Sequence, residues 1–293
     1  MTGEAIACTR AQMLLGEGLR WDVRREELLA VDILAGCVYR GRVADDGGVS
    51  LIREYEVPGT VGAVAPVHGD DGWLLAAGRG FVHLSQDGSV HTIAEVAPEG
   101  TRMNDGACDP RGRFWAGTLA DDFRPGAGAL YRLERDGRIE VMLEELTISN
   151  GIGWSPDGGS MYYIDSTTQR VVEYDYDLET GELGAQSVFA DIETTDGLPD
   201  GLTVDADGGV WVCLFGGGRI RRYRPDGSLD REIVLPLTNP TCPAFGGADL
   251  GTLYITTARH RLTEDQLARE PLAGAVLQLR PGELGVAPYR FSG

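Results

Sequence analysis

Short apolar runs bounded by polar turn residues recur along the whole chain. Each run has five residues, mostly aliphatic and aromatic, which is typical of a buried β-strand. The six runs span residues 28–32, 73–77, 114–118, 161–165, 210–214 and 253–257. Their first residues lie 41 to 49 positions apart. Because a four-stranded propeller blade has about this length, the spacing predicts six repeated blades.

The segments around these runs support the same register. Turns rich in Asp and Gly precede three of the runs, at residues 108–113, 155–160 and 204–209, and such residues suit tight turns. A second run, alternating apolar and polar residues, follows four of them, at 128–132, 170–174, 219–223 and 274–279. A β-sandwich would explain short strands but not so long a repeat. The sequence therefore predicts an all-β chain that folds as a single six-bladed β-propeller domain over residues 1–293.

One segment departs from the strand pattern, at residues 259–271. Thr263 and Gln266 have the spacing of a capping box, and the helix formers Leu267 and Ala268 follow them, which predicts a short helix. As an insertion in the sixth repeat, this segment either covers one end of the propeller or packs as an ordinary surface loop.

Polar residues recur 10 or 11 positions before four of the six runs. They are Glu17, Asn104, Asn150 and Asp200, and equivalent positions in the blades of a propeller surround its central channel. Glycine follows each of them within two residues, so we expect each side chain to lie at a tight turn.

Two carboxylates and two carboxamides that met at the channel would repel one another or stay unsatisfied without a cation. Oxygen ligands suit hard divalent ions, so the pattern predicts one divalent metal ion in the central channel. Ca²⁺ is the first choice, and Mg²⁺ and Mn²⁺ are similar in chemistry. Fe²⁺ or Zn²⁺ can also occupy such a site, because they bind most ligands more tightly. The alternative is that these residues only form turns.

Six segments of the chain resemble the regucalcin/gluconolactonase family of senescence marker proteins and sugar-lactone lactonases. They are GEGLRW (16–21), TRMNDGACDPRGRFWAGTLADD (101–122), ISNGIGWSPDGGSMYYIDS (148–166), EYDYDLETGEL (173–183), LPDGLTVDADGGVWVCLFGGGRI (198–220) and APYRF (287–291). The resemblance implies a six-bladed propeller with one divalent metal in the channel.

The resemblance also implies roles for individual residues. The family's metal ligands correspond to Glu17, Asn150 and Asp200, and its substrate contacts to Arg102 and Asn104. A further acidic contact to sugar hydroxyls corresponds to Asp122, where Asp replaces the more usual Glu and shortens the reach. Leu19 stands where the family usually has proline.

The activity that the resemblance implies is hydrolysis of a sugar lactone, such as gluconolactone or a pentonolactone, to the aldonic acid. The metal would polarise the carbonyl and stabilise the developing oxyanion. Asp200 is the candidate catalytic base, and the alternative is that water activated by the metal attacks without it. Two other functions stay open: a related metal-dependent esterase or phosphotriesterase, and a non-catalytic calcium-binding propeller. No GxSxG elbow points to serine catalysis.

Composition limits the classes of binding partner that we expect for this protein. A net charge of −19 disfavours nucleic acid and anionic membranes, and no apolar run is long enough to span a bilayer. Met1 to Leu15 lacks the basic start and apolar stretch of a leader, so we expect a cytoplasmic protein, a monomer or weak homo-oligomer. Five scattered cysteines and four histidines show no metal-binding spacing, and we expect reduced, mostly buried thiols.

Overall fold

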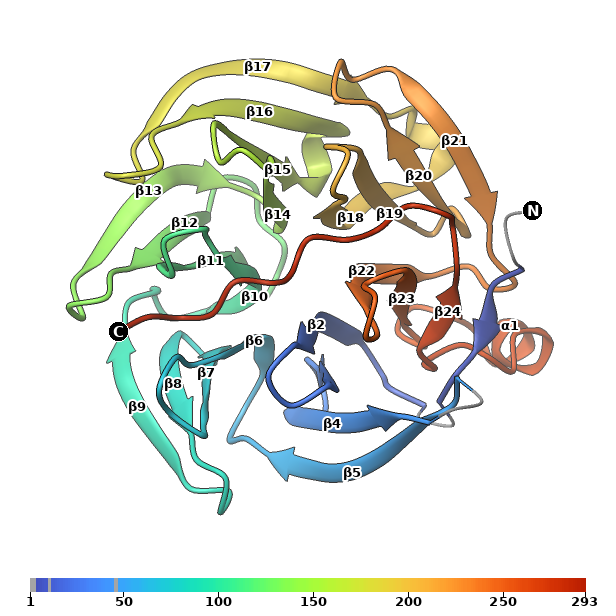
Figure 1. Ribbon diagram of the computed structural model, residues 1–293, viewed down its shortest axis with the longest axis horizontal. Coiled ribbons are helices and arrows are strands. Elements are labelled where there is room, and N and C mark those ends of the chain that lie inside the picture. The colour runs from blue at the N-terminus through green and yellow to red at the C-terminus, as the bar shows by residue number, and fades with distance from the viewer. Residues whose placement is uncertain (1–3, 10–11, 45–46) are drawn as a thin grey trace.

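The computed structural model describes residues 4–9, 12–44 and 47–293, and it confirms the propeller. Six four-stranded antiparallel sheets stand around a central channel like the blades of a fan (Figure 1). That all these strands belong to one domain over 1–293 stays a prediction, and residues 1–3, 10–11 and 45–46 lie outside the described part of the chain.

Five blades run in chain order from the innermost to the outermost strand. The first has β2 (Gly16–Asp22), β3 (Glu27–Asp32), β4 (Cys37–Val43) and β5 (Val49–Glu56), and the second has β6 (Val61–Pro66), β7 (Trp73–Ala77), β8 (Gly80–Leu84) and β9 (Val90–Glu95). The third has β10 (Thr101–Cys108), β11 (Phe114–Ala120), β12 (Gly128–Leu133) and β13 (Ile139–Leu146). The fourth has β14 (Ser149–Trp154), β15 (Ser160–Asp165), β16 (Arg170–Tyr176) and β17 (Leu183–Asp191), and the fifth has β18 (Leu198–Val204), β19 (Val210–Phe215), β20 (Arg219–Tyr223) and β21 (Leu229–Val234). Short 3₁₀ turns lie at Ser166–Thr168 and Thr194–Asp196.

The sixth blade joins the two ends of the chain. It contains β22 (Pro240–Gly246), β23 (Thr252–Thr257) and β24 (Leu277–Leu279), and its outer strand is β1 (Ile6–Ala7) from the N-terminal region. The pairing of β1 with β24 closes the ring, which the sequence pattern did not predict. The expected strand at 274–279 is shorter than predicted, because Gly274 has a positive φ of 85° and lies in a turn.

All six apolar runs form the second strand of a blade, where both faces are covered by neighbouring blades. The buried apolar residues group into six clusters among the described residues, one at each interface between consecutive blades. Trp115 and Trp211 are fully buried at equivalent positions in the third and fifth blades, and Trp73 is fully buried on the opposite face of the second blade, against the first blade. Burial on two faces explains why the runs are continuously apolar rather than alternating.

The expected helix is α1 (Glu264–Arg269), and its capping box is confirmed. The Thr263 hydroxyl accepts from the Gln266 N–H at 3.3 Å, and the Gln266 side chain accepts from the Thr263 N–H at 3.0 Å. The residues just before this helix, His260 and Arg261, line the channel cavity described below. The start of the insertion therefore covers one end of the channel.

The C-terminal tail crosses the other end of the channel as a strap (Figure 1). Gly285 forms a bridge with Asp205 of the fifth blade, and Phe291 forms one with Val67 of the second blade. Phe291 is also buried in the cluster between the second and third blades. The tail thus joins blades on opposite sides of the ring.

The structure bears on two expectations from the composition, the state of the cysteines and the lack of a membrane-spanning segment. All five cysteines are buried and free, which confirms the expected thiols. In the described part of the chain, none of the helices has both the length and the apolar character needed to cross a membrane.

Candidate functional site

The four polar residues found by counting back along the repeats occupy equivalent places, on innermost strands. Glu17 lies on β2, Asn104 on β10, Asn150 on β14 and Asp200 on β18. The expectation that they lie in tight turns is wrong. Each stands instead at a β-bulge, where the register with the second strand shifts, and a bulge re-aims side chains.

The glycines that follow these residues act mainly through their small size. Gly18 alone has a positive φ, of 56°. A Cβ at Gly151 would lie 2.6 Å from the Asp200 carbonyl oxygen, and one at Gly201 would lie 2.7 Å from that of Thr241. Larger residues there would push the innermost strands of neighbouring blades apart, so these glycines keep the channel narrow.

The four residues line one cavity at the channel end where the innermost strands begin. Glu17 is 4% exposed and Asp200 7% exposed, so both carboxylates lie at its floor. Its walls are apolar, formed by Leu15, Ile33, Leu119, Ile148, Leu198 and Phe215. A cavity with apolar walls and few polar groups at the floor suits a small organic ligand.

Burial and mutual repulsion raise the pKa of both floor carboxyl groups. The pKa of Glu17 lies well above its usual value because of burial first, then the charges of Asp200 and Asp105, although the Gly18 N–H donates to it at 3.0 Å. The pKa of Asp200 is raised by burial and by Asp105, and a hydrogen bond from Asn150 opposes the shift. Neither carboxylate has a salt-bridge partner within the described residues.

A chain of hydrogen bonds fixes the two carboxamides. The Asn104 amide donates to the Ser149 carbonyl at 2.8 Å and to Asn150 Oδ1 at 3.0 Å. The Asn150 amide donates to Ser166 Oγ at 2.8 Å, and Ser166 Oγ donates to the Pro199 carbonyl at 2.7 Å. The Asn150 oxygen is therefore turned away from Ser166 and toward the Asn104 amide.

The expected substrate contacts differ in their placement. Arg102 lines the cavity and donates through Nη1 to the Met103 carbonyl at 3.0 Å and to Asn104 Oδ1 at 2.8 Å. Asn104 lines the cavity too, but its own polar atoms are already engaged. The Asp122 side chain is 64% exposed and paired with Arg124 at 3.0 Å. It is absent from the cavity lining, so a contact with substrate stays a prediction.

Sequence reasoning missed several residues of the site. Asp105, next to Asn104, is a third buried carboxylate. Burial raises its pKa, and the charge of Arg20 opposes this shift only in part. Ser166, Phe123, His260 and Arg261 complete the lining. Asp105 was detectable as a carboxylate in the same segment, whereas the others come from loops outside the repeat register.

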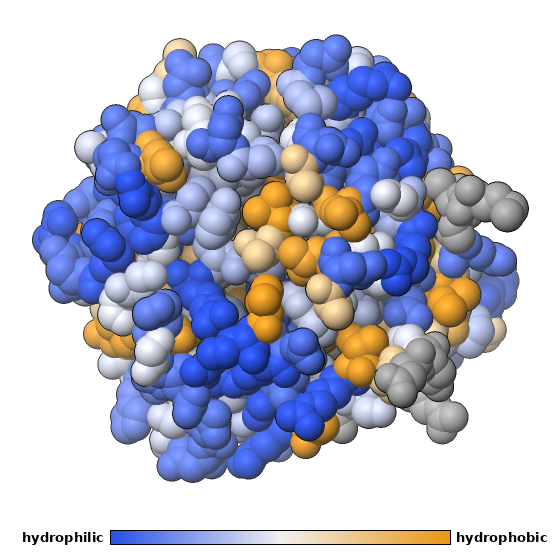
Figure 2. Space-filling model, viewed as in Figure 1, coloured by the Kyte–Doolittle hydropathy of each residue, from blue (hydrophilic) through white to orange (hydrophobic). Residues whose placement is uncertain are grey.

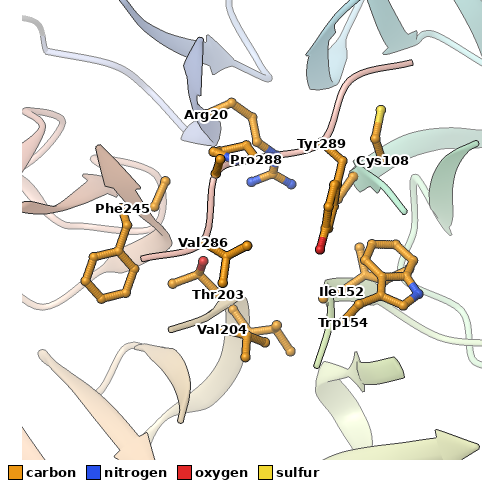
Figure 3. Close-up of a pocket in the computed structure, with 15 residues that line it drawn as sticks. Arg20, Cys108, Ile152, Trp154, Thr203, Val204, Phe245, Val286, Pro288 and Tyr289 are labelled. Carbon is orange, nitrogen blue, oxygen red and sulfur yellow. The ribbon is translucent and has the colours of Figure 1, made fainter. Parts of the chain in front are cut away.

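A second cavity lies at the opposite end of the channel, under the C-terminal strap (Figure 3). Arg20 faces it from β2, and Pro288 and Tyr289 of the tail lean over it. Arg20 donates through Nη2 to the Gly106 carbonyl at 2.7 Å, so this side chain separates the two ends of the channel. Figure 2 shows this face, where apolar residues gather along the path of the tail.

The donor set at the floor fits a hard divalent cation. It consists of the Glu17 and Asp200 carboxylates and the Asn150 carboxamide oxygen, all buried and lining one cavity. Nowhere in the described ranges do three His, Cys, Asp or Glu side chains gather as a metal-binding group, so the carboxamide is needed to make a third ligand. Two repelling carboxylates without cationic partners are the chemistry that a dication stabilises.

Comparison with known proteins agrees with the resemblance seen in the sequence. The model of the SMP-30/Gluconolactonase/LRE-like region matches residues 15–259. The chain is 37% identical to 6-deoxy-6-sulfogluconolactonase of Pseudomonas putida over 99% of both chains, and 35% identical to regucalcin of Gallus gallus over 95% of both. A crystal structure of a calcium-binding protein, regucalcin, from Agrobacterium tumefaciens superposes with a TM-score of 0.92 at 28% identity, covering 100% of this chain and 98% of that one.

Proposed function

Because the chain belongs to the SMP-30/gluconolactonase/LRE-like family, we propose that it is a metal-dependent lactonase that opens a sugar lactone to its aldonic acid. The observation that carries the proposal is the convergence of Glu17, Asn150 and Asp200 at the floor of one cavity, with Arg102 beside them. The apolar walls would hold the sugar ring and exclude bulk water.

The ligand set in this proposal is Glu17, Asn150 and Asp200, and the all-oxygen donors favour Ca²⁺, with Mg²⁺ or Mn²⁺ as alternatives. When bound, the metal would supply Lewis acidity toward the lactone carbonyl and lower the pKa of a nearby water. Asn104 and Ser166 hold the Asn150 carboxamide in the orientation that ligation needs.

Asp200 is the proposed base. In hydrolysis, a water oxygen bonds to the carbonyl carbon and gives up a proton, which Asp200 accepts. The bond between that carbon and the ring oxygen then breaks, and the ring oxygen takes a proton to become a hydroxyl group. The products are a carboxylic acid, which ionises, and the free hydroxyl.

Arg102 is the proposed substrate-orienting residue. Its hydrogen bonds within the described part of the chain use only Nη1, so Nη2 and Nε remain to contact lactone oxygens. Asn104 holds both Arg102 and Asn150, which makes it a positioning residue in this arrangement. Binding of substrate by Asn104 itself would require one of these bonds to be exchanged.

The test uses metal-stripped protein and a panel of aldonolactones. Ca²⁺, Mg²⁺, Mn²⁺, Fe²⁺ or Zn²⁺ is restored singly, and initial rates are corrected for spontaneous opening. We expect turnover that requires metal and falls at least about 100-fold in Asp200→Ala, but not in Asp207→Ala, an exposed turn residue. Metal binding without turnover of any lactone would overturn the proposal and favour an esterase or a calcium-binding propeller.

A further inference from the structure

The cavity of the proposed active site is acidic at its floor and basic at its mouth. Glu17 and Asp200 are buried at the floor, whereas Arg102 and His260 are half-buried and Arg261 is exposed. Arg102 comes from β10, and His260 and Arg261 come from the turn before α1, in a chain with a net charge of −19. Within the described residues, none of the three is within salt-bridge distance of a carboxylate.

Arg102 is a desolvated cation. Burial lowers its pKa to about 10, and Asp121 and Glu17 only partly oppose this shift. The guanidinium is therefore still charged at neutral pH, but the neighbouring protein stabilises it less than water would. An anion placed beside Nη2 or Nε would compensate this charge.

Arg261 is held over the cavity by an aromatic contact. Its guanidinium carbon lies 4.9 Å from the centre of the Phe123 ring. Both residues have left-handed backbones, with φ of 66° and 57°, which costs free energy for side chains of this size. Attraction between a cation and an aromatic ring does not use up hydrogen-bond donors, so the N–H groups of Arg261 can still donate to a ligand.

The charges of the cavity do not balance once a divalent metal is bound. A dication at the floor would neutralise Glu17 and Asp200, and the third buried carboxylate, Asp105, interacts with Arg20. Arg102 and Arg261 would then leave positive charge above the metal, which Asp121 offsets only in part at Arg102. Burial and the charges of Arg261 and Arg102 also lower the pKa of His260, so this imidazole is neutral at pH 7. A neutral sugar lactone would leave this positive field uncompensated.

We propose that the preferred substrate is a sugar lactone with an anionic group, such as a phosphate, sulfonate or carboxylate, at its end far from the lactone carbonyl. Arg261 binds this group at the mouth, while the carbonyl lies at the floor and Arg102 contacts the lactone oxygens between them. Arg261, stacked on Phe123, is a specificity-determining residue that the repeat pattern does not contain. This inference rests on the proposed lactonase function and names the substrate class.

The test compares glucono-1,5-lactone with its 6-phospho and 6-sulfo derivatives and with the lactone of glucaric acid, using metal-loaded protein. For each substrate kcat/KM is measured in the wild type, in Arg261→Gln and in Arg269→Gln. Arg269 lies in the same insertion, is exposed and does not line the cavity. The three anionic substrates separate tetrahedral from planar anions.

We expect the wild type to prefer at least one anionic lactone. Arg261→Gln should lower the ratio of anionic to neutral kcat/KM about tenfold, the scale of one charge-assisted hydrogen bond, mainly through KM. Arg269→Gln should leave this ratio unchanged. The ratio should also fall as salt is added, because Arg261 is exposed and its charge is screened.

Two results would overturn the inference, and they are distinguishable. The anion site is refuted, and the lactonase function stands, if the wild type has the same kcat/KM for the neutral lactone as for every anionic lactone. The same holds if Arg261→Gln lowers kcat/KM equally for all substrates. If the wild type hydrolyses no lactone with any metal, the proposed function fails and this inference fails with it.

Discussion

The side-chain amide of Asn150 donates to Ser166 Oγ at 2.8 Å, and this bond fixes which end of the carboxamide faces Asn104. Ser166 follows β15 and donates onward to the Pro199 carbonyl, next to Asp200. A serine outside the innermost strands thus connects two proposed metal ligands from neighbouring blades. Such indirect partners set both the orientation and the basicity of ligands.

Replacing Ser166 tests this connection. Ser166→Ala leaves the Asn150 amide without its acceptor, and we expect metal affinity to fall roughly 10- to 100-fold. Isothermal titration of metal-stripped protein measures the change. Ser187→Ala, an exposed serine on β17, is the control and should bind metal like the wild type. Equal affinity in the two variants would show that Ser166 does not orient Asn150.

Charge removal at the floor should stabilise the metal-free protein. Folding raises the pKa of Asp200, so the charged form disfavours the folded state once pH exceeds the ordinary carboxyl value. This penalty grows as pH rises toward the folded pKa. We therefore expect metal-free Asp200→Asn to be more stable than metal-free wild type at pH 7, by roughly 1–2 kcal/mol.

Urea unfolding in the presence of a chelator gives the comparison. At about pH 3 the carboxyl is protonated in both folded and unfolded chains, so the difference between variant and wild type should vanish. With metal added at pH 7, the order should reverse, because only the wild type keeps the full ligand set. A difference that is independent of pH would contradict the electrostatic explanation.

A buried ion pair supports the fifth blade. Asp205 is fully buried, accepts from Arg222 Nε at 2.7 Å and accepts from the Trp211 indole at 2.8 Å. Asp205→Ala would leave the Arg222 charge and the indole N–H without this partner. We expect a loss of about 3–5 kcal/mol in the free energy of unfolding, measured by urea titration. Asp207→Ala is the control and should change this free energy little. Asp230 also accepts from Arg222 Nη1 at 3.1 Å, and a loss below about 1 kcal/mol would show that this second carboxylate compensates.

The C-terminal strap should depend on its aromatic anchor. The Phe291 side chain is buried between the second and third blades, and its backbone carbonyl accepts from the His68 N–H at 2.7 Å.

 We expect Phe291→Ala to cost about 3–5 kcal/mol. Hydrogen exchange at the amides of His68 and Phe291 should quicken, whereas Leu284→Ala, an exposed tail residue, should leave it unchanged. Slow exchange in Phe291→Ala would show that backbone contacts alone hold the tail.

The charge of Arg261 should be visible in the titration of His260. The pKa of His260 is lowered by burial and then by the positive charges of Arg261 and Arg102. Removing one of these charges favours the imidazolium, so Arg261→Gln should raise the pKa of His260, as followed by NMR of the imidazole. Arg269→Gln is the control and should not change it. An unchanged value in Arg261→Gln would place Arg261 too far from His260 to act on it.

Much of the fold could be predicted from the sequence because propeller blades repeat. Each blade buries its second strand on both faces, which requires a continuous apolar run, and the six runs lie at equivalent positions. Counting back from them located Glu17, Asn150 and Asp200, because the distance from the innermost strand to the second strand is nearly constant. The resemblance to the family named the same three residues from their motifs.

The bulges and glycines of the innermost strands could not be predicted from local sequence. A polar residue next to glycine is typical of a turn, and the sequence alone favoured that interpretation for Asn150 and Asp200. In the folded chain these residues lie on strands, and Gly151 and Gly201 admit the backbone of the neighbouring blade. Contact between blades, rather than local conformation, determines the role of these glycines.

The sequence by itself determined the number of blades, the apolar second strands, the capped helix α1 and the oxygen-bearing positions at the channel. These features depend on patterns within a single repeat, where neighbours in sequence are neighbours in space. Only the tertiary structure decided the closure of the ring by β1, the strap that ends at Phe291, and the stacking of Arg261 on Phe123 over the cavity. Each of these joins residues far apart in sequence, and no local periodicity encodes such a contact, because it forms only when all the blades have packed together.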